Sequence, residues 1–170
     1  MEVASHDFRN VLSGWASGVA ILTSRAGDRL YGITITAFSA VSLDPPLVLV
    51  CVNAKSPLNE IIAESKMAAI SILNAGQREI SDLFSGSGNA GLRFDRCEHH
   101  PGEGGMPLID GALGHLECGV QDVLRSGDHM VYIVAPRNCS HAIRDPLLYF
   151  RGQYQELIYG RRSEERGENK

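Results

Sequence analysis

The sequence contains no long apolar run and carries little net charge. No apolar stretch in its 170 residues approaches the roughly 20 that a membrane-spanning helix needs. The first residues, MEVASHDFRN, lack the basic segment and apolar core of a signal peptide, so we expect a cytoplasmic protein. A formal net charge of -4 gives no general attraction for nucleic acid.

Cysteines with the spacing of a metal or redox motif are also missing. The four cysteines are Cys51, Cys97, Cys118 and Cys139. No C-x-x-C occurs among them, which excludes a zinc ribbon and a thioredoxin motif, and we expect free thiols that pack as small apolar groups. Residues 97–100 read Cys-Glu-His-His, but no zinc spacing is completed, so we interpret them as a solvated loop and predict no metal.

Residues 86–91 match the dinucleotide fingerprint G-x-G-x-x-G, but the context is wrong. That motif works when its first glycine ends a strand and its last glycine opens a helix. Here it follows a helical pattern and precedes Arg93, Phe94 and Asp95 without an apolar helix behind it. We interpret the segment as a flexible loop.

The chain is long enough for one domain with its own core, which we place at residues 1–159. Residues 160–170 are charged and nearly devoid of apolar side chains, so we expect them to be disordered. The strands expected from apolar alternation or short apolar runs cover residues 19–23, 31–36, 47–52, 67–73, 112–123, 130–135 and 147–150. The helices expected from apolar periodicity cover residues 6–16 and 77–84 and a segment after Ser56. These strands do not alternate regularly with helices, which predicts an α+β domain, mostly antiparallel β and shaped as a barrel.

Several local signals define the elements further. Phe8, Val11, Leu12 and Trp15 form one apolar stripe on the first helix. Ser56 and Pro57 are typical of an N-cap followed by the first helical position, and the helix after them should turn Leu58, Ile61 and Ile62 inward. Residues 85–107 are rich in glycine and are expected to form a long loop.

Two polar segments are candidates for a binding site. Residues 32–42 carry hydroxyl side chains at short intervals, which is typical either of a polar strand edge or of a wall along a planar polar ligand. Lys55 and Ser56 follow a buried strand and open a helix, where the helix N-terminus favours a phosphate. An N-cap role explains Ser56 equally well.

Together these segments resemble the flavin reductase family with the FMN-binding split-barrel fold. The resemblance runs from about Phe8 to Tyr154, and its most specific pieces are GITITAFSAVSLDPP at residues 32–46, SGDH at residues 126–129 and PLLYFRGQY at residues 146–154. The chain is most similar to reductase components of two-component flavin monooxygenases that hydroxylate aromatic compounds, of the 4-hydroxyphenylacetate type. The resemblance implies an antiparallel split β-barrel of Greek-key type with a few short peripheral helices.

The same resemblance implies a set of site residues. Those implied at the flavin are Thr34, Ile35, Thr36, Ala37, Ser39, Cys51, Val52, Asn53, Lys55, Ser56, Arg93 and Phe94. Those implied at the nicotinamide are His129, Arg151 and Tyr154. His129 is the expected catalytic residue, placed to orient the nicotinamide carboxamide. Thr36 and Ser71 stand where the family more often has other polar residues.

The implied activity is reduction of FMN or FAD by NADH or NADPH, with delivery of reduced flavin to a separate monooxygenase. Neither the preferred flavin, the preferred nicotinamide nor the monooxygenase follows from the sequence. A flavin carrier or sensor without turnover, and an FMN-dependent oxidase of the pyridoxamine-phosphate type, remain alternatives. Residues 47–52 and 67–73 are apolar on both faces, more than one small barrel interior needs, which predicts a homodimer with the flavin near its interface.

Overall fold

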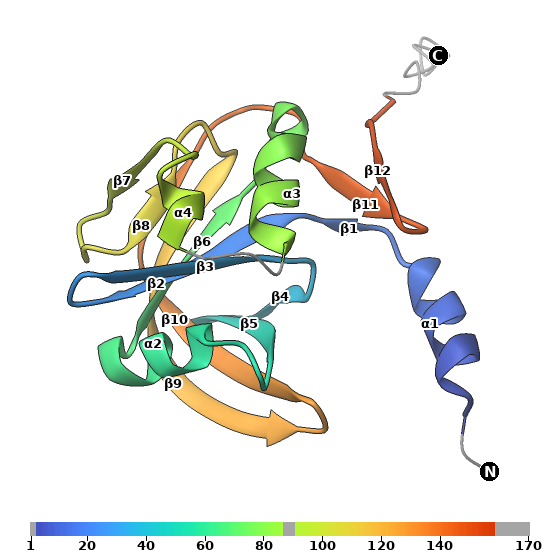
Figure 1. Ribbon diagram of the computed structural model, residues 1–170, viewed down its shortest axis with the longest axis horizontal. Coiled ribbons are helices and arrows are strands. Elements are labelled where there is room, and N and C mark those ends of the chain that lie inside the picture. The colour runs from blue at the N-terminus through green and yellow to red at the C-terminus, as the bar shows by residue number, and fades with distance from the viewer. Residues whose placement is uncertain (1–2, 87–90, 159–170) are drawn as a thin grey trace, which may run out of the picture.

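A seven-stranded antiparallel sheet forms the body of the protein (Figure 1). The computed structural model describes residues 3–86 and 91–158. Its helices are α1 (Ser5–Ser13), α2 (Leu58–Ser65), α3 (Arg78–Ser85) and α4 (Gly91–Phe94), with a 3-10 turn at Ala75–Gln77. Its strands are β1 (Ser17–Gly18), β2 (Ala20–Ala26), β3 (Arg29–Ile35), β4 (Phe38–Leu43), β5 (Pro46–Asn53), β6 (Met67–Ile72), β7 (His99–Pro101), β8 (Pro107–Ile109), β9 (Gly114–Ser126), β10 (His129–His141), β11 (Leu148–Phe150) and β12 (Gln153–Gln155).

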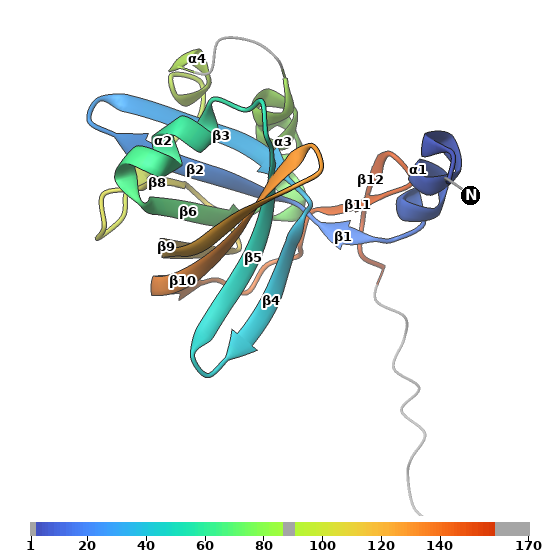
Figure 2. The same ribbon diagram turned by 90° about the horizontal axis from the view of Figure 1, so that it is seen from below.

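The large sheet has the strand order β3-β2-β6-β9-β10-β5-β4. Its two edge strands, β3 and β4, follow each other in the chain and are joined by only Thr36 and Ala37. The sheet therefore curls until its edges approach without pairing, as the second view shows (Figure 2). This is the predicted split antiparallel barrel, and the Thr36–Ala37 link lies at the split.

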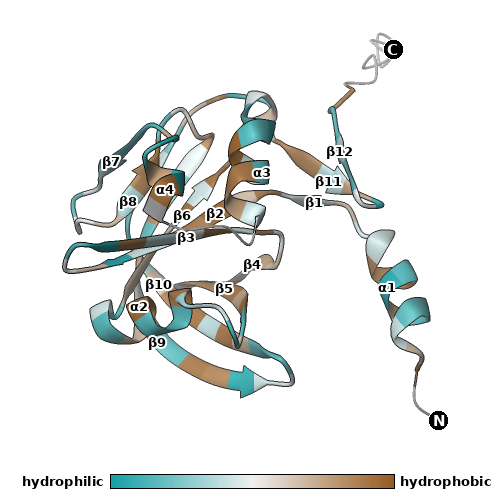
Figure 3. Cartoon of the chain, in the orientation of Figure 1, coloured by the Kyte–Doolittle hydropathy of each residue, from teal (hydrophilic) through white to brown (hydrophobic). Residues whose placement is uncertain are grey.

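The main core fills the inside of this curled sheet. Alternate residues of β5, Val48, Val50 and Val52, are buried there, because successive side chains of a strand point to opposite faces. The helix α2 closes the core with Leu58 and Ile62, while Ile61 is also buried, as predicted. Colouring by hydropathy shows the apolar character of β5 and of neighbouring strands (Figure 3).

A second core lies on the other face of β2. Val19 and Ile21 belong to it, whereas Ala20 and Leu22 belong to the main core, so β2 is covered on both faces. The helix α3 packs Phe84 into this second core, with Ile80 and Leu83 partly buried against it. The predicted helix at residues 77–84 is thus confirmed, and the strands predicted at residues 19–23 and 31–36 pair with each other as β2 and β3.

The helix α1 differs from the other elements because no residue of it is buried. It ends at Ser13, so Trp15 lies beyond it, and the predicted extent to residue 16 was too long. The apolar stripe exists, but Phe8 is 57% exposed and Val11 is 76% exposed. Both views place α1 beside β1, β11 and β12, away from the body of the large sheet (Figures 1 and 2).

Two other predictions need correction. Helix α2 begins at Leu58, with Pro57 at the N-cap position, although the Ser56 hydroxyl does accept a hydrogen bond from the Leu58 N–H at 3.3 Å. The expected loop over residues 85–107 contains α4 and β7, because Phe94 and Cys97 are buried in the second core and hold this segment in place.

The glycine-rich motif at residues 86–91 falls mostly on residues 87–90, which lie outside the described part of the chain, as does the tail from residue 160 onward. Its first glycine, Gly86, follows helix α3 rather than a strand, which agrees with rejecting the dinucleotide fingerprint. Its last glycine, Gly91, does open the one-turn helix α4, which was not expected. Within the two described segments, no helix is long and apolar enough to cross a membrane.

Candidate functional site

A cavity of about 620 Å³ opens beside the split of the barrel. One wall is the end of β3 and the link after it, with Thr34, Ile35 and Thr36. This size is typical of a small-molecule site. The structure therefore brings three of the predicted ring-contacting residues to one cavity.

The facing wall is the polar side of helix α3. No residue of this helix was among the site residues predicted from the sequence. Its lining residues are Arg78, Ser81, Asp82 and Ser85. Their spacing of three, four and seven places them on one face of a helix, so this stripe was readable once the helix was assigned. The Thr34 hydroxyl donates to the Ser81 carbonyl oxygen at 2.6 Å and ties β3 to this wall.

Tyr154 closes the same cavity from strand β12. Its hydroxyl donates to the Asp82 carboxylate at 2.8 Å and lies 2.9 Å from the Ser81 hydroxyl. The Arg78 guanidinium lies over its ring, with 5.1 Å from Cζ to the ring centroid. Burial raises the pKa of the Tyr154 phenol, so the side chain stays a neutral hydrogen-bonding group.

Ala37 and Arg151 line a second groove that adjoins the cavity. Thr36 lines both spaces, which makes them continuous. Arg151 and Gly152 form the two-residue turn between β11 and β12, both with positive φ, as a type I′ hairpin turn requires.

A second group of predicted residues gathers at the end of β5. His129, at the start of β10, pairs in register with Asn53, and the Ala54 N–H donates to the Asp128 carbonyl at 2.9 Å. The Asn53 side-chain oxygen accepts the Lys55 N–H at 2.9 Å. The SGDH segment at residues 126–129 and residues 51–56, which are distant in sequence, therefore meet at one rim of the sheet.

The predicted residues at this rim, Cys51, Asn53, Lys55, Ser56 and His129, do not line the cavity beside β3. Cys51 precedes Asn53 by two residues, and its N–H donates to the Ala37 carbonyl at 3.2 Å. Side chains two apart on a strand share a face, so Cys51 and Asn53 point the same way. Ala37 in turn joins Thr36 at the split.

His129 is half-exposed and held by its neighbour. Its Nδ1–H donates to the Asp128 carboxylate at 2.7 Å, which leaves Nε2 for a ligand. This hydrogen bond lowers the pKa of the Asp128 carboxyl, and the positive charge of a protonated His129 adds to the effect. Asp128 therefore remains ionised and fixes the tautomer of the imidazole.

Two residues predicted at the flavin, Val52 and Ser39, lie outside the cavity. The side chain of Val52 is fully buried in the main core, so only its backbone faces the rim. Ser39 lies exposed on the edge strand β4, where its hydroxyl donates to the Ala40 carbonyl at 3.2 Å. Neither side chain lines the cavity beside β3.

Arg93 and Phe94 lie in the second core instead of lining the cavity. The Arg93 guanidinium, 5% exposed, donates to the carbonyl oxygens of Gly32 at 2.9 Å, Phe84 at 3.4 Å and Gly86. The ring of Phe94 packs edge-to-face on Phe84, with 5.3 Å between centroids. In this structure the pair braces α4 against β3 and α3.

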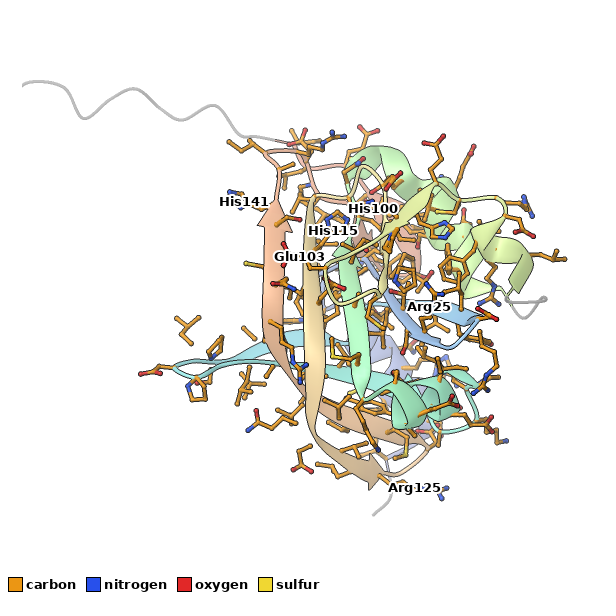
Figure 4. All side chains as sticks on the ribbon, turned by 90° about the vertical axis from the view of Figure 1, so that its left-hand side faces the viewer. Arg25, His100, Glu103, His115, Arg125 and His141 are labelled. Carbon is orange, nitrogen blue, oxygen red and sulfur yellow. The ribbon has the colours of Figure 1, made fainter. Side chains whose placement is uncertain are left out.

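The histidine-rich segment lies elsewhere, over strands β9 and β10 (Figure 4). His100 donates to the Asp110 carboxylate, and its ring centroid lies 6.0 Å from that of His115. His115 uses both nitrogens, with Nε2–H donating to the Ile109 carbonyl and Nδ1 3.1 Å from the Ser140 hydroxyl. Within residues 3–86 and 91–158, no group of three or more metal-binding side chains converges on one point.

Sequence and structure comparisons place this chain among proteins of one kind. Residues 12–157 match the model of the flavin reductase like domain. The reductase component of a 4-nitrophenol 4-monooxygenase/4-nitrocatechol 2-monooxygenase from Rhodococcus opacus is 33% identical, over 89% of this chain and 80% of that protein. The 4-hydroxyphenylacetate 3-monooxygenase reductase component of Salmonella typhimurium is 34% identical, over 77% of this chain and 78% of that protein.

A solved structure agrees with these matches. The NADH:FAD oxidoreductase SgcE6 of Streptomyces globisporus, in complex with NAD and FAD fragments, superposes with a TM-score of 0.85 at 29% identity, over 93% of this chain and 98% of that one. The family model covers nearly the whole described chain, including β3, the link at the split, α3 and the strands that carry Tyr154 and His129. The chain therefore belongs to the flavin reductase-like family.

Proposed function

We propose that this protein uses NADH to reduce a flavin, FMN or FAD, and supplies the reduced flavin to a separate monooxygenase. The observation that carries the proposal is the cavity between β3 and the polar face of α3, in a chain of the flavin reductase-like family. The Rhodococcus and Salmonella relatives are named as reductase components of monooxygenases, and another Rhodococcus relative, 33% identical, is named as an NADH-dependent flavin reductase.

The residues present fit a flavin. Thr34 to Thr36 offer hydroxyl and backbone groups along one wall, and Ser81, Ser85 and Tyr154 offer polar groups opposite. A planar ring with polar edges needs this mixture of a flat wall and hydrogen-bonding groups. When bound, the flavin supplies the hydride-accepting ring system.

The protein's own groups hold and orient the reactants. The Nδ2 amide group of Asn53 and the Lys55 ammonium lie at the rim, where they stabilise negative charge on the reduced flavin. His129, fixed by Asp128, donates through Nε2 when protonated or accepts there when neutral, and so orients the nicotinamide carboxamide. Its contribution is positioning, because hydride transfer between the two rings requires no base.

Lys55 and Ser56 are proposed to seat the flavin phosphate. They lie in the turn between β5 and α2, where the Asn59 side chain donates to the carbonyl oxygens of Asn53 and Ser56 and fixes the backbone. The turn thus presents the Lys55 ammonium and the Ser56 hydroxyl just before a helix N-terminus, a combination that favours a phosphate.

We also propose that the active form is a homodimer. The stripe of α1 exposes Phe8 and Val11, and the short edge strand β4 exposes Val41 and Leu43, at 50% and 91%. An isolated helix as short as α1 is marginal in water, so a packing partner for its apolar stripe is expected. The cytoplasmic location remains an expectation from the sequence.

NADH consumption in air, with and without added FMN or FAD, tests the proposed activity against its two rivals. We expect oxidation of NADH that depends on added flavin. A protein that binds flavin tightly but consumes no NADH would be a carrier, and turnover of pyridoxamine phosphate in its place would identify the oxidase.

A further inference from the structure

Three hydroxyl groups on the walls of the cavity beside β3 direct their protons at other protein groups. The Thr34 hydroxyl donates to the Ser81 carbonyl oxygen at 2.6 Å, and the Ser85 hydroxyl donates to the Asp82 carbonyl oxygen at 2.9 Å. The Tyr154 hydroxyl donates to the Asp82 carboxylate at 2.8 Å. Thr34, Ser85 and Tyr154 all line the cavity. Because a hydroxyl has only one proton, these groups offer oxygen lone pairs to a ligand.

The direction of the Tyr154 proton follows from its two neighbours. The phenol oxygen lies 2.8 Å from the Asp82 carboxylate and 2.9 Å from the Ser81 hydroxyl. An ionised carboxylate can only accept a hydrogen bond, whereas a serine hydroxyl can also donate one. Ser81 is fully buried, so its proton needs an acceptor, and the Tyr154 oxygen provides it. The Tyr154 proton therefore goes to Asp82, and Tyr154 is left as an acceptor.

Arg78, which also lines the cavity, is held by the same two residues. Its Nε lies 3.8 Å from the Asp82 carboxylate, and its Cζ lies 5.1 Å from the centroid of the Tyr154 ring. The hairpin of β11 and β12 that carries Tyr154 belongs to a separate sheet with β1 (Figure 1). These contacts with α3 therefore connect the two sides of the cavity, and Asp82 holds Tyr154 in place while it sets the direction of the phenol proton.

We propose that Asp82, acting through Tyr154, makes the cavity selective for a ligand edge that donates an amide N–H. The inference rests on the proposed function, because the N3–H group of a flavin and the carboxamide N–H of a nicotinamide are both donors of this kind. Tyr154 contacts the ligand, and Asp82 is a positioning residue. A site built to bond an N–H group rejects an analogue without it, because the acceptor is then left without a partner.

Paired analogues test this selectivity. N3-methyl-FMN lacks the flavin N–H, and the reduced 3-acetylpyridine analogue of NADH lacks the carboxamide N–H, while each carries the same charge as its parent. Calorimetric titration of the full-length protein freed of flavin gives the Kd of each analogue divided by the Kd of its parent. For one of the two pairs we expect a ratio of about ten or more in the wild type, the equivalent of one hydrogen bond, and that pair identifies the ligand.

Variants separate this role from a general effect on the fold. Y154F removes the acceptor and should lower that ratio about tenfold. D82A should lower it as well, because the Tyr154 proton is then free to point into the cavity, whereas D82N keeps an acceptor oxygen and should keep the wild-type ratio. E79A is the matched control, since Glu79 is an exposed carboxylate of the same helix that does not line the cavity. A loss of stability affects both ligands of a pair alike and leaves the ratio unchanged.

The outcomes distinguish this inference from the proposed function. If the wild type prefers neither parent, or if Y154F and D82A leave both ratios unchanged, the inference is wrong, and reduction of flavin by the wild type would leave the proposed function standing. A fall as large in D82N or E79A as in D82A would also overturn the inference. If the wild type reduces no flavin, the proposed function is wrong, and the Kd ratios alone decide the role of Asp82.

Discussion

Replacement of Arg93 by methionine tests whether this arginine braces the fold or touches the flavin. Methionine keeps an apolar stem of similar length but removes the guanidinium, which donates to the carbonyl oxygens of Gly32, Phe84 and Gly86. A hydrogen bond to a charged group contributes roughly 1.5–3 kcal/mol, and neighbouring bonds are not additive. We therefore expect R93M to lower the free energy of unfolding by about 2–4 kcal/mol.

Urea unfolding followed by far-ultraviolet circular dichroism measures this loss, because the sole tryptophan is too exposed to report on the core. For a chain of this size, each kcal/mol corresponds to roughly 2–4 °C in Tm, so a fall of about 4–16 °C is expected. R96M is the matched control, since Arg96 is exposed nearby, and it should change stability by no more than about 0.5 kcal/mol. Unchanged stability of R93M together with weakened FMN binding would refute the bracing role and place Arg93 at the flavin.

Four further predictions follow from the site and from the thiols. H129A should raise the KM for NADH or slow flavin reduction by up to about tenfold, because it removes one hydrogen bond to the nicotinamide. The affinity for FMN per folded molecule should stay unchanged. A lower Tm with unaltered kinetics would show that His129 has a structural role only. Riboflavin should bind more weakly than FMN by about 1.5–3 kcal/mol if Lys55 and Ser56 hold the phosphate, and equal affinities in a calorimetric titration would remove that role. Burial raises the pKa of Cys118 to about 12 from 9.0, so this thiol stays neutral in the folded state and the free energy of unfolding should fall as pH rises from about 9 toward 12. At pH 8 iodoacetamide should modify exposed Cys139 first; equally rapid labelling of Cys118 would contradict its burial.

Sequence patterns predicted the elements whose signals are local. The strands predicted at residues 19–23 and 31–36 exist and pair as β2 and β3. The unbroken apolar run at residues 47–52 predicted a strand that is apolar on both faces, and β5 has one face buried in the core and the other only partly buried. The Thr34–Thr36 segment was placed at the ligand through its resemblance to a family, and the structure puts it on a cavity. The polar stripe of α3 follows from the same helical spacing, but nothing in the sequence shows that this face lines the cavity beside β3.

Features that depend on tertiary contacts were not predictable in this way. Glu117, on the polar-looking side of its strand, is only 2% exposed, because its carboxylate accepts N–H groups from Gly104 and Met106 of a distant turn. Arg93 is buried for a similar reason, since its partners are carbonyl groups of other segments. The apolar stripe of α1 predicted a helix correctly, yet could not show that no residue of this helix is buried in the domain.

Anaerobic stopped-flow mixing of the flavin-loaded protein with NADH tests the central claim most directly. We predict that the visible absorbance of the flavin bleaches in a phase that saturates with NADH concentration and is faster than reduction of free flavin by NADH. Admission of air should then restore the oxidised flavin and allow repeated turnover. Flavin that binds but bleaches no faster than free flavin at any NADH concentration would contradict the claim that this protein is a flavin reductase.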